Sequence, residues 1–299
     1  MTQQNPYIKA PVFNLQKAIE AMRNFFRENP DLHNINYTFY HEYTPQQVLT
    51  DENYQISELK NYVKPGSRVL TLGGTGDHAL FCKLYGAEYV LTFDYSCHSY
   101  LISSLKIAAI KAFQDTNEYS NFLHDLQDYA PDICRIHNIA RVLSQLYADQ
   151  REYIVTANAI HFPLCVSNNK NHALYELSQD NYNKLRNSVT KPFPFIQTNI
   201  TELNKKLCDD KFGLVYLSNA LDFVKPDEAL YVLKNITNHM LPDGVLFITT
   251  QHDNFCMQMT ELCNAVFKQP DWNIKPFYAS KYSRIFNHFI IQRNQNIKG

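Results

Sequence analysis

The stretch RVLTLGGTGDHALFCKLYGAEYVLTFD, from Arg68 to Asp94, determines how the rest of the chain is interpreted. It begins with a short apolar run rich in β-forming residues. It then passes through Gly73-Gly74-Thr75-Gly76 and continues as an apolar helical stretch to Leu84. After Gly86, a second apolar run predicts a buried strand that ends on Asp94. The order strand, glycine-rich turn, helix, strand, acid predicts one βαβ unit of a parallel sheet.

The glycines and the acid also predict a ligand. Glycine lets the backbone turn sharply and lets a ligand approach the first turn of a helix without meeting a Cβ atom. An acid about 20 residues further on, at the end of the second strand, can bind the hydroxyls of a ribose, and Asp94 stands in this place relative to Gly73. The loop is not G-x-G-x-x-G, so the pattern favours a nucleotide in general over NAD. The alternative is an ordinary βαβ unit with turn glycines and a solvated Asp94.

Composition limits the class of protein. The chain has 299 residues, 45% of them hydrophobic and 13% aromatic, which is enough for one large α/β domain with additions. Its formal net charge is −1 and it has no long Lys/Arg run, so we expect no nucleic-acid partner. Seven cysteines without a CxxC pair favour reduced thiols and a cytoplasmic location. We expect no signal peptide and no transmembrane segment.

The same composition gives little support to a metal centre. Cys134-x-x-His137 has half the spacing of a metal site, but no matching second pair follows nearby. We therefore predict no metal site.

Residues 1–60 are expected to form an N-terminal helical or lid segment. Residues 14–28 have the apolar spacing of an amphipathic helix, and residues 44–62 predict another. Between them, four aromatic residues crowd into Tyr37–Tyr43. That tyrosine-dense run is either a packed edge strand or a loop that lies over a ligand.

The chain after Asp94 predicts a helix and then an interruption. Residues 97–113 are helical by propensity and spacing, with Leu101, Leu105, Ala108 and Ala112 on one face. Residues 115–190 break the alternation of strands and helices and predict a helical insertion. Its helices are expected around residues 119–126 and along a stripe made of Ile139, Val142, Leu143 and Leu146.

The alternation then resumes. Strands are predicted at 195–198, 212–217, 245–250 and 285–292, helices at 226–240 and 255–267, and a turn at 241–244. The expected fold is an α/β, doubly wound, mostly parallel sheet over residues 61–299. Ligands of such sheets bind beyond the carboxyl ends of the strands.

The order of these pieces resembles the class I S-adenosylmethionine-dependent transferases, which have a methyltransferase-like Rossmann fold. The resemblance implies that adenosine lies over Gly73–Gly76, that Asp94 holds the ribose and that Asn199 contacts the adenine. It implies that residues 217–222 line the methionine end. The expected set of residues that bind S-adenosyl-L-methionine, the co-substrate, is Gly73, Gly74, Thr75, Gly76, Asp94, Tyr95, Asn199, Ile200, Ser218 and Asn219.

A closer resemblance is to the first-step enzyme of betaine-lipid synthesis and its relatives. It rests on Asp94 followed by the helix Leu105-Lys106-Ile107-Ala108-Ala109-Ile110, on YLSNALDFV (216–224) and on YSRIFNHF (282–289). In this chain Ser96-Cys97 and Ser99 replace the Asn-Pro and Gln usual after the acid. The resemblance implies transfer of the 3-amino-3-carboxypropyl group of S-adenosylmethionine, not its methyl group.

Six residues outside the nucleotide set are candidates for roles in that chemistry. Asp222 is a candidate general base or ligand of the methionine amino group, with a helix or turn cap as the alternative reading. Tyr40 and Tyr43 are candidates to cover the sulfonium by cation–π contact. Arg284, with Lys281 and Tyr282 beside it, is a candidate to bind the substrate carboxylate, and a solvated surface pair is the alternative.

Several functions stay open at this point. The leading hypothesis is aminocarboxypropyl transfer to a small-molecule or lipid acceptor, with release of methylthioadenosine. In one variant the methionine amine attacks its own Cγ and closes an azetidine-2-carboxylate ring. The alternatives are a methyltransferase and a non-catalytic nucleotide-binding protein. The acceptor is not readable from the sequence, and a homodimer is compatible with it.

Overall fold

The computed structural model describes residues 60–74, 76–95, 98–125, 133–148, 150–152, 178–250, 253–268, 270–278 and 287–294. The N-terminal segment predicted for residues 1–60 therefore lies outside the described residues except for its last position. Within the predicted insertion, residues 126–132, 149 and 153–177 also lie outside the described residues.

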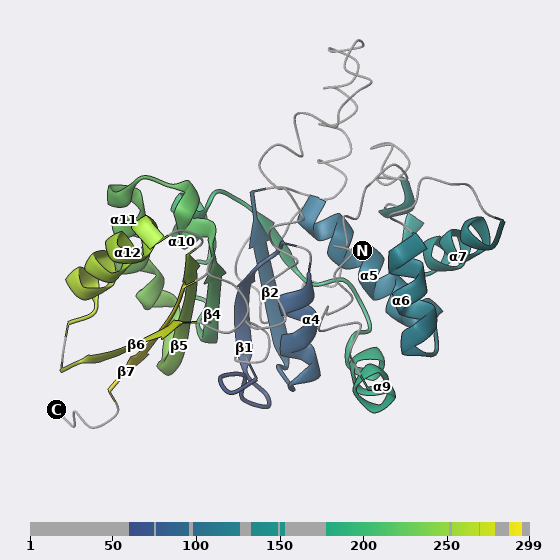
Figure 1. The fold of residues 1–299 in the computed structure, drawn as a ribbon, viewed down its shortest axis with the longest axis horizontal. Coiled ribbons are helices and arrows are strands. Elements are labelled where there is room, and N and C mark those ends of the chain that lie inside the picture. The colour runs from purple at the N-terminus through teal and green to yellow at the C-terminus, as the bar shows by residue number, and fades with distance from the viewer. Residues whose placement is uncertain are drawn as a thin grey trace, which may run out of the picture.

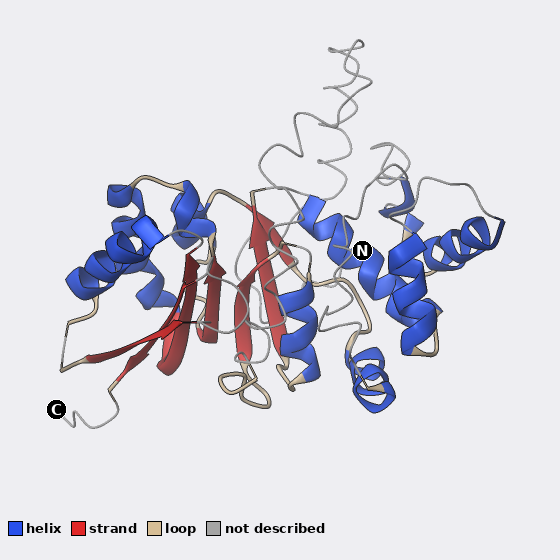
Figure 2. Ribbon diagram, in the orientation of Figure 1, coloured by secondary structure: helices blue, strands red, loops and turns tan. Residues whose placement is uncertain are grey.

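A seven-stranded sheet forms the centre of the molecule (Figure 2). Its strands are β1 (Arg68–Leu72), β2 (Tyr89–Asp94), β3 (Phe195–Gln197), β4 (Phe212–Ser218), β5 (Met240–Thr250), β6 (Trp272–Tyr278) and β7 (Asn287–Arg293). The strand order is β3-β2-β1-β4-β5-β7-β6. The first five are parallel, whereas β7 pairs antiparallel with both β5 and β6.

This sheet confirms the predicted fold class. The order reverses at β1, as in doubly wound sheets, and an antiparallel strand is inserted next to β5, as in the class I methyltransferase-like Rossmann fold. The predicted strands agree with β1, β2, β3, β4 and β7 to within about two residues at each end.

The helices lie on both sides of the sheet (Figure 1). They are α4 (Asp77–Leu84), α5 (His98–Ala112), α6 (Thr116–Asp125), α7 (Ile133–Ser144), α9 (Gln179–Ser188), α10 (Ile200–Lys206), α11 (Pro226–Ile236) and α12 (Asp253–Val266), with 3-10 turns η2 (Ala220–Phe223) and η3 (Thr237–His239). No helix in the described part of the chain is long and apolar enough to cross a membrane.

Two hydrophobic clusters pack on the two faces of the sheet. Alternate residues of each strand point to opposite faces, so that Val69 joins one cluster and Leu70 the other. Helices α4, α5, α6, α7 and α9 contribute to the first cluster, and α10, α11 and α12 to the second. Because both faces are covered, most positions of the central strands β1, β2 and β4 are apolar, which is why these strands are recognisable in the sequence.

Two sequence predictions need correction. The helix predicted to run from 226 to 240 ends at Ile236, and Met240 instead begins β5 by pairing with Phe212. The spacing in the sequence placed Leu105, Ala108 and Ala112 of α5 on one face. Residues Lys106–Ile110 are instead all buried, because this part of α5 is packed on every side.

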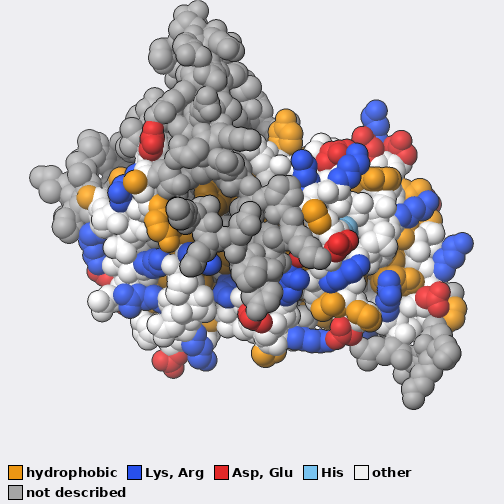
Figure 3. Space-filling model, turned by 180° about the vertical axis from the view of Figure 1, so that it is seen from behind, with side chains coloured by type: hydrophobic (Ala, Val, Ile, Leu, Met, Phe, Trp, Pro, Cys, Tyr) orange, Lys and Arg blue, Asp and Glu red, His pale blue; other side chains and the backbone are white. Residues whose placement is uncertain are grey.

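Figure 3 shows one face of the described residues, seen from behind the view of Figure 1. Lys and Arg side chains are interspersed with Asp and Glu over that face. This pattern is what a near-neutral chain is expected to show.

Candidate functional site

The glycine-rich turn connects β1 to α4 at the carboxyl edge of the sheet. The Gly73 N–H donates to the Phe93 carbonyl of β2 (2.6 Å), and the Gly76 N–H donates to the Gly73 carbonyl (2.8 Å). Gly74 and Gly76 have φ values of +45° and +83°, a region that side chains with a Cβ atom avoid. The turn is thus fixed to the end of β2 before any ligand binds.

The close approach of helix α5 requires glycine at two of the three glycine positions of the turn. A Cβ atom on Gly73 would lie 2.9 Å from the Cβ atom of Ser99, and one on Gly76 would lie 2.6 Å from that of Ser103. A Cβ atom on Gly74, in contrast, would meet nothing within 4 Å. The sequence pattern predicted that these glycines allow a sharp turn and the approach of a ligand. In the structure, Gly73 and Gly76 allow α5 to pack, and only Gly74 faces open space.

The different surroundings of the glycines predict different stabilities. Gly76→Ala should lower the free energy of unfolding by about 2–5 kcal/mol, because it adds overpacking against Ser103 to the cost of a left-handed residue. Gly74→Ala should cost only about 1–2 kcal/mol, the left-handed term alone. Gly66→Ala is the matched control, since Gly66 has φ +76° and open space around it. Urea unfolding measures all three, and equal losses for Gly76→Ala and Gly66→Ala would contradict the packing argument.

Asp94 holds the turn from the other side. Its carboxylate is buried, and Oδ2 accepts hydrogen bonds from the Gly74 N–H (2.9 Å) and the Ser99 hydroxyl (2.6 Å). The Asp94 carbonyl accepts from the Thr198 N–H (2.8 Å), just after β3. Asp94 therefore links the turn, α5 and β3, and it places a carboxylate beside the open side of Gly74.

A buried ion pair lies directly beneath the turn. The Lys106 ammonium of α5 donates to Oδ1 of Asp77 at 2.7 Å, and their side chains are 5% and 0% exposed. Asp77 is the first residue of α4, where a carboxylate also favours the positive end of the helix dipole. The pair joins the two helices that flank the glycines.

Next to this pair, two buried histidines are held neutral. Burial lowers the pKa of His78 to about 4, with opposing contributions from Asp77 and Lys106, and burial lowers the pKa of His288 to about 4 as well. The His78 ring packs 4.4 Å from the Tyr216 ring, centroid to centroid. His288 Nδ1 lies 3.3 Å from the Thr249 hydroxyl, which lies 3.5 Å from the Tyr216 hydroxyl.

This polar layer leads to the end of β4. The Tyr216 hydroxyl donates to Ser218 Oγ at 3.5 Å, and Ser218 is held at φ +50°, an unusual value for a residue with a side chain. Ser218 and Asn219 are both buried. Asp222 follows on η2 and is half-buried, and its N–H donates to the Asn219 carbonyl (3.0 Å). The predicted methionine-end residues thus stand next to one another at the carboxyl edge.

The predicted adenine side is more varied. Tyr95 is 61% exposed, directly after β2. Asn199 caps α10, because its side-chain oxygen accepts from the Thr201 N–H (3.1 Å), and Ile200 packs its side chain in the core. The signal for this cap is legible in the sequence as Asn199 followed three residues later by Glu202.

The remaining predicted residues lie outside the described part of the chain. They are Thr75, Tyr40, Tyr43, Lys281, Tyr282 and Arg284. Of the described candidates, Gly73, Gly74, Gly76, Asp94, Tyr95, Asn199, Ser218, Asn219 and Asp222 all stand at or just beyond the carboxyl ends of β1, β2, β3 and β4. Among the described residues, no cluster of three or more His, Cys, Asp or Glu could hold a metal ion.

Three residues that shape this site were not predicted from the sequence. Ser99 was noted only as a departure from a family pattern, yet it binds Asp94. Asp77 and Lys106 were not recognised as partners, because 29 residues separate them and no local pattern connects them. The run of small and polar residues at 96, 99, 103 and 104 was the available signal that α5 approaches the glycines closely.

Comparisons with known proteins give similar folds at low sequence identity. No family model matches the chain, and no curated protein matches it. A ribosomal protein L11 methylase from Lactobacillus delbrueckii subsp. bulgaricus is 12% identical with a TM-score of 0.41, covering 81% of this chain and 79% of its own. A TehB-like SAM-dependent methyltransferase from Corynebacterium glutamicum is 10% identical with a TM-score of 0.41, covering 92% and 99%. DhpI, in a complex with SAH, is 13% identical with a TM-score of 0.41, covering 93% and 97%.

Proposed function

We propose that this protein is an S-adenosylmethionine-dependent transferase. The observation that carries the proposal is the Asp94 carboxylate, anchored by Gly74 and Ser99 next to the one described glycine of the turn that faces open space. A ribose needs such a fixed acceptor, and an adenosine needs a surface without side chains to lie on. The doubly wound sheet places both at the edge where ligands of these folds bind.

The proposed binding mode assigns a task to each group of residues. The adenosine lies over Gly74 with its ribose hydroxyls on Asp94, and Tyr95 and Asn199 border the adenine. Ser218 and Asn219 contact the methionine end. Asp77 and Lys106 compensate each other's charge, and the two buried histidines are neutral. These four side chains therefore present no uncompensated positive charge to the cationic sulfonium.

For the group transferred, we propose 3-amino-3-carboxypropyl. This finer step rests on the resemblance carried by residues 105–110 and 216–224. The acceptor's lone pair forms a bond to the methionine Cγ while the Cγ–sulfur bond breaks. Its electron pair stays on sulfur, and neutral methylthioadenosine leaves. Asp222 takes the proton that the acceptor loses. Rate enhancement comes mainly from holding the nucleophile in line with Cγ at about 3–3.5 Å.

The products of S-adenosylmethionine distinguish the candidate reactions. The purified protein is incubated with S-adenosylmethionine, alone and with a cell extract, and the products are resolved by mass spectrometry. Methylthioadenosine supports aminocarboxypropyl transfer, and its formation together with azetidine-2-carboxylate in the absence of extract supports ring closure. Formation of S-adenosylhomocysteine would contradict aminocarboxypropyl transfer and indicate methyl transfer instead. Tight binding with no turnover would favour a nucleotide-binding protein without catalysis.

Asp94 and Asp222 should separate binding from turnover. Asp94→Ala should weaken binding of S-adenosylhomocysteine by at least tenfold in titration calorimetry, because it removes a charged hydrogen-bond acceptor from the ribose. Asp222→Asn should leave that affinity within a few-fold and slow the formation of product from S-adenosylmethionine.

Two further variants serve as controls. Ser99→Ala removes one donor to the Asp94 carboxylate but keeps the carboxylate, so its effect should be smaller than that of Asp94→Ala. Asp227→Asn alters an exposed carboxylate in the first turn of α11 and should change nothing. Normal S-adenosylhomocysteine binding by Asp94→Ala would remove the basis of the proposed function.

A further inference from the structure

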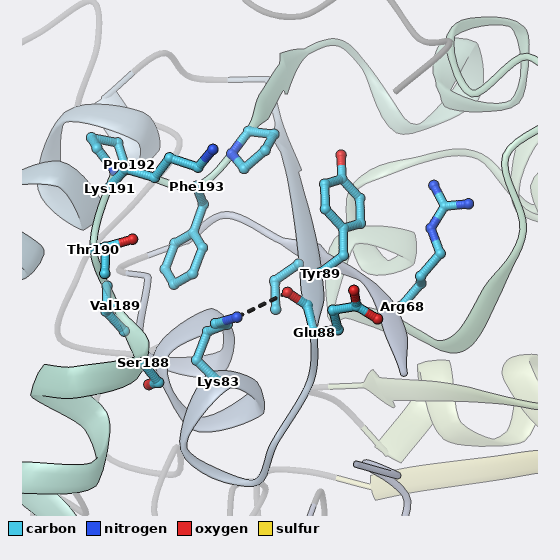
Figure 4. Close-up of a pocket in the computed structure, with 12 residues that line it drawn as sticks. Arg68, Lys83, Glu88, Tyr89, Ser188, Val189, Thr190, Lys191, Pro192 and Phe193 are labelled. Carbon is cyan, nitrogen blue, oxygen red and sulfur yellow. Dashed lines mark hydrogen bonds between the residues drawn. The ribbon is translucent and has the colours of Figure 1, made fainter. Parts of the chain in front are cut away.

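A pocket opens at the amino-terminal ends of the strands, on the opposite side of the sheet from the carboxyl ends where the candidate site lies (Figure 4). Its volume is about 340 Å³, and its walls are the end of α4, the starts of β1 and β2, and the segment Ser188–Pro194 between α9 and β3. Tyr89 lines it at the start of β2, whereas Asp94 ends the same strand. At about 3.3 Å per residue, the two positions are roughly 16 Å apart. The pocket is therefore separate from the candidate transferase site.

The lining of this pocket carries an excess of positive charge. Arg68, Lys83 and Lys191 contribute cations, and Glu88 is the acid among the described lining residues. Arg68 forms an ion pair at 2.7 Å with Asp210, a residue that does not line the pocket. Lys83 instead donates to the main-chain carbonyls of Ala87 and Glu88, both at 2.9 Å. Those carbonyls position the ammonium without neutralising it.

Lys83 is partly buried, so a nearby anion would stabilise its charged form more than it would for a lysine in water. Desolvation lowers the pKa of Lys83, and the Glu88 carboxylate only partly opposes this shift. An anion in the pocket would favour the charged ammonium further. Charge-assisted hydrogen bonds of this kind are about twice as strong as neutral ones.

The apolar part of the pocket is already formed. Val90, Val189 and Phe193 line it and are buried. The segment that carries Phe193 is fixed to β2, because the Thr92 N–H and hydroxyl both donate to the Pro194 carbonyl at 2.9 and 3.0 Å. Proline at 192 and 194 further restricts this segment. A ligand would not have to order these walls on binding.

We propose that this pocket binds a compact organic anion, namely a flat ring that carries a phosphate monoester. Its volume is at the lower end of the range for small-molecule sites, which suits one ring and its headgroup. Lys83 and Lys191 bind the phosphate, and the ring packs between Phe193 and Val189. Asp210 compensates the charge of Arg68, so Lys83 and Lys191 against Glu88 leave the lining with an excess of one positive charge, the sign that attracts a phosphate.

Phenyl phosphate is the probe that tests both halves of this proposal. Titration calorimetry on the full chain should show saturable binding of phenyl phosphate. Phenol, which lacks the anion, and inorganic phosphate, which lacks the ring, should each bind at least tenfold more weakly. Equal affinity for phenyl phosphate and phenol would overturn the role of the cations. Equal affinity for phenyl phosphate and inorganic phosphate would overturn the role of the apolar wall.

Variants at exposed positions localise the binding without risk to the fold. Lys191→Gln should weaken phenyl phosphate binding at least fivefold, and Thr190→Trp should block it by filling the pocket. Lys234→Gln is the matched control, an exposed lysine on α11 away from the pocket. Unchanged binding by both pocket variants would overturn the proposal.

A competition experiment with S-adenosylhomocysteine, the ligand of the proposed transferase site, tests the location of the second site independently. Because the two sites lie at opposite edges of the sheet, saturating S-adenosylhomocysteine should leave phenyl phosphate binding unchanged. Displacement of phenyl phosphate would place it in the transferase site and refute this second site. Loss of S-adenosylhomocysteine binding in Asp94→Ala, with phenyl phosphate binding intact, would show that the two proposals stand or fall separately.

Discussion

Replacing Lys106 by methionine should lower the free energy of unfolding by about 3–5 kcal/mol, because it leaves the Asp77 carboxylate buried without its counter-ion. The Asp77 side chain is 0% exposed, and the Lys106 side chain is 5% exposed. Methionine keeps the length and apolar stem of lysine, so the loss measures the charge and not a cavity. Urea unfolding at neutral pH followed by circular dichroism gives the change directly.

A double variant separates pairing from burial. Asp77→Asn combined with Lys106→Met removes both charges and should recover most of the loss, since well-packed neutral groups often replace a buried ion pair at little cost. Lys205→Met tests an exposed pair, with Glu202 at 2.9 Å, and should leave the urea midpoint nearly unchanged. A Lys106→Met protein as stable as the wild type would contradict the structural role of the pair.

The second large effect is acid destabilisation through His78 and His288. Burial lowers the pKa of each histidine to about 4, from an ordinary value of 6.5. Their neutral forms are favoured in the folded state, so their contribution is complete above pH 6.5 and is lost as pH falls from 6.5 towards 4. A difference of about 2.5 units corresponds to about 3 kcal/mol for each histidine. Together they approach the whole stability of a typical domain.

The test compares pH slopes and not stabilities at one pH. Urea midpoints are measured between pH 7.5 and pH 4.5 for the wild type, His78→Gln and His288→Gln. Each variant loses one group that must bind a proton on unfolding, so its stability should fall less steeply over this range. Slopes identical to that of the wild type in both variants would show that neither histidine is buried in its neutral form.

Local sequence signals predicted much of the fold. Apolar runs of five or six residues, bounded by glycine, gave β1 and β2 to within a residue, because these strands are buried on both faces. The end of α11 was misplaced because Leu233, Ile236 and Met240 continue a helical spacing across the boundary. Only pairing of Met240 with Phe212, a contact between distant segments, places it in a strand.

The site was predicted less completely than the fold. Asp94 was identified because an acid after a buried strand has a known spacing from the glycines. Its partner Ser99 and the Asp77–Lys106 pair depend on how α5 crosses the turn, which no local pattern encodes. The close packing of α5 against Gly73 and Gly76 was not predicted, because a missing side chain looks the same in the sequence whether a turn, a ligand or a helix requires it.

The position of β7 has a consequence for how the protein is made. This strand, near the end of the chain, inserts between β5 and β6, so β5 keeps one edge unpaired until residues 287–293 have been synthesised. A nascent chain in which β1 to β5 have left the ribosome therefore exposes the unpaired N–H and C=O groups of β5, which can pair with a strand of another unfinished copy. Slow translation of the last segment would lengthen that exposure, and a chaperone that covers sheet edges would be most useful during this interval.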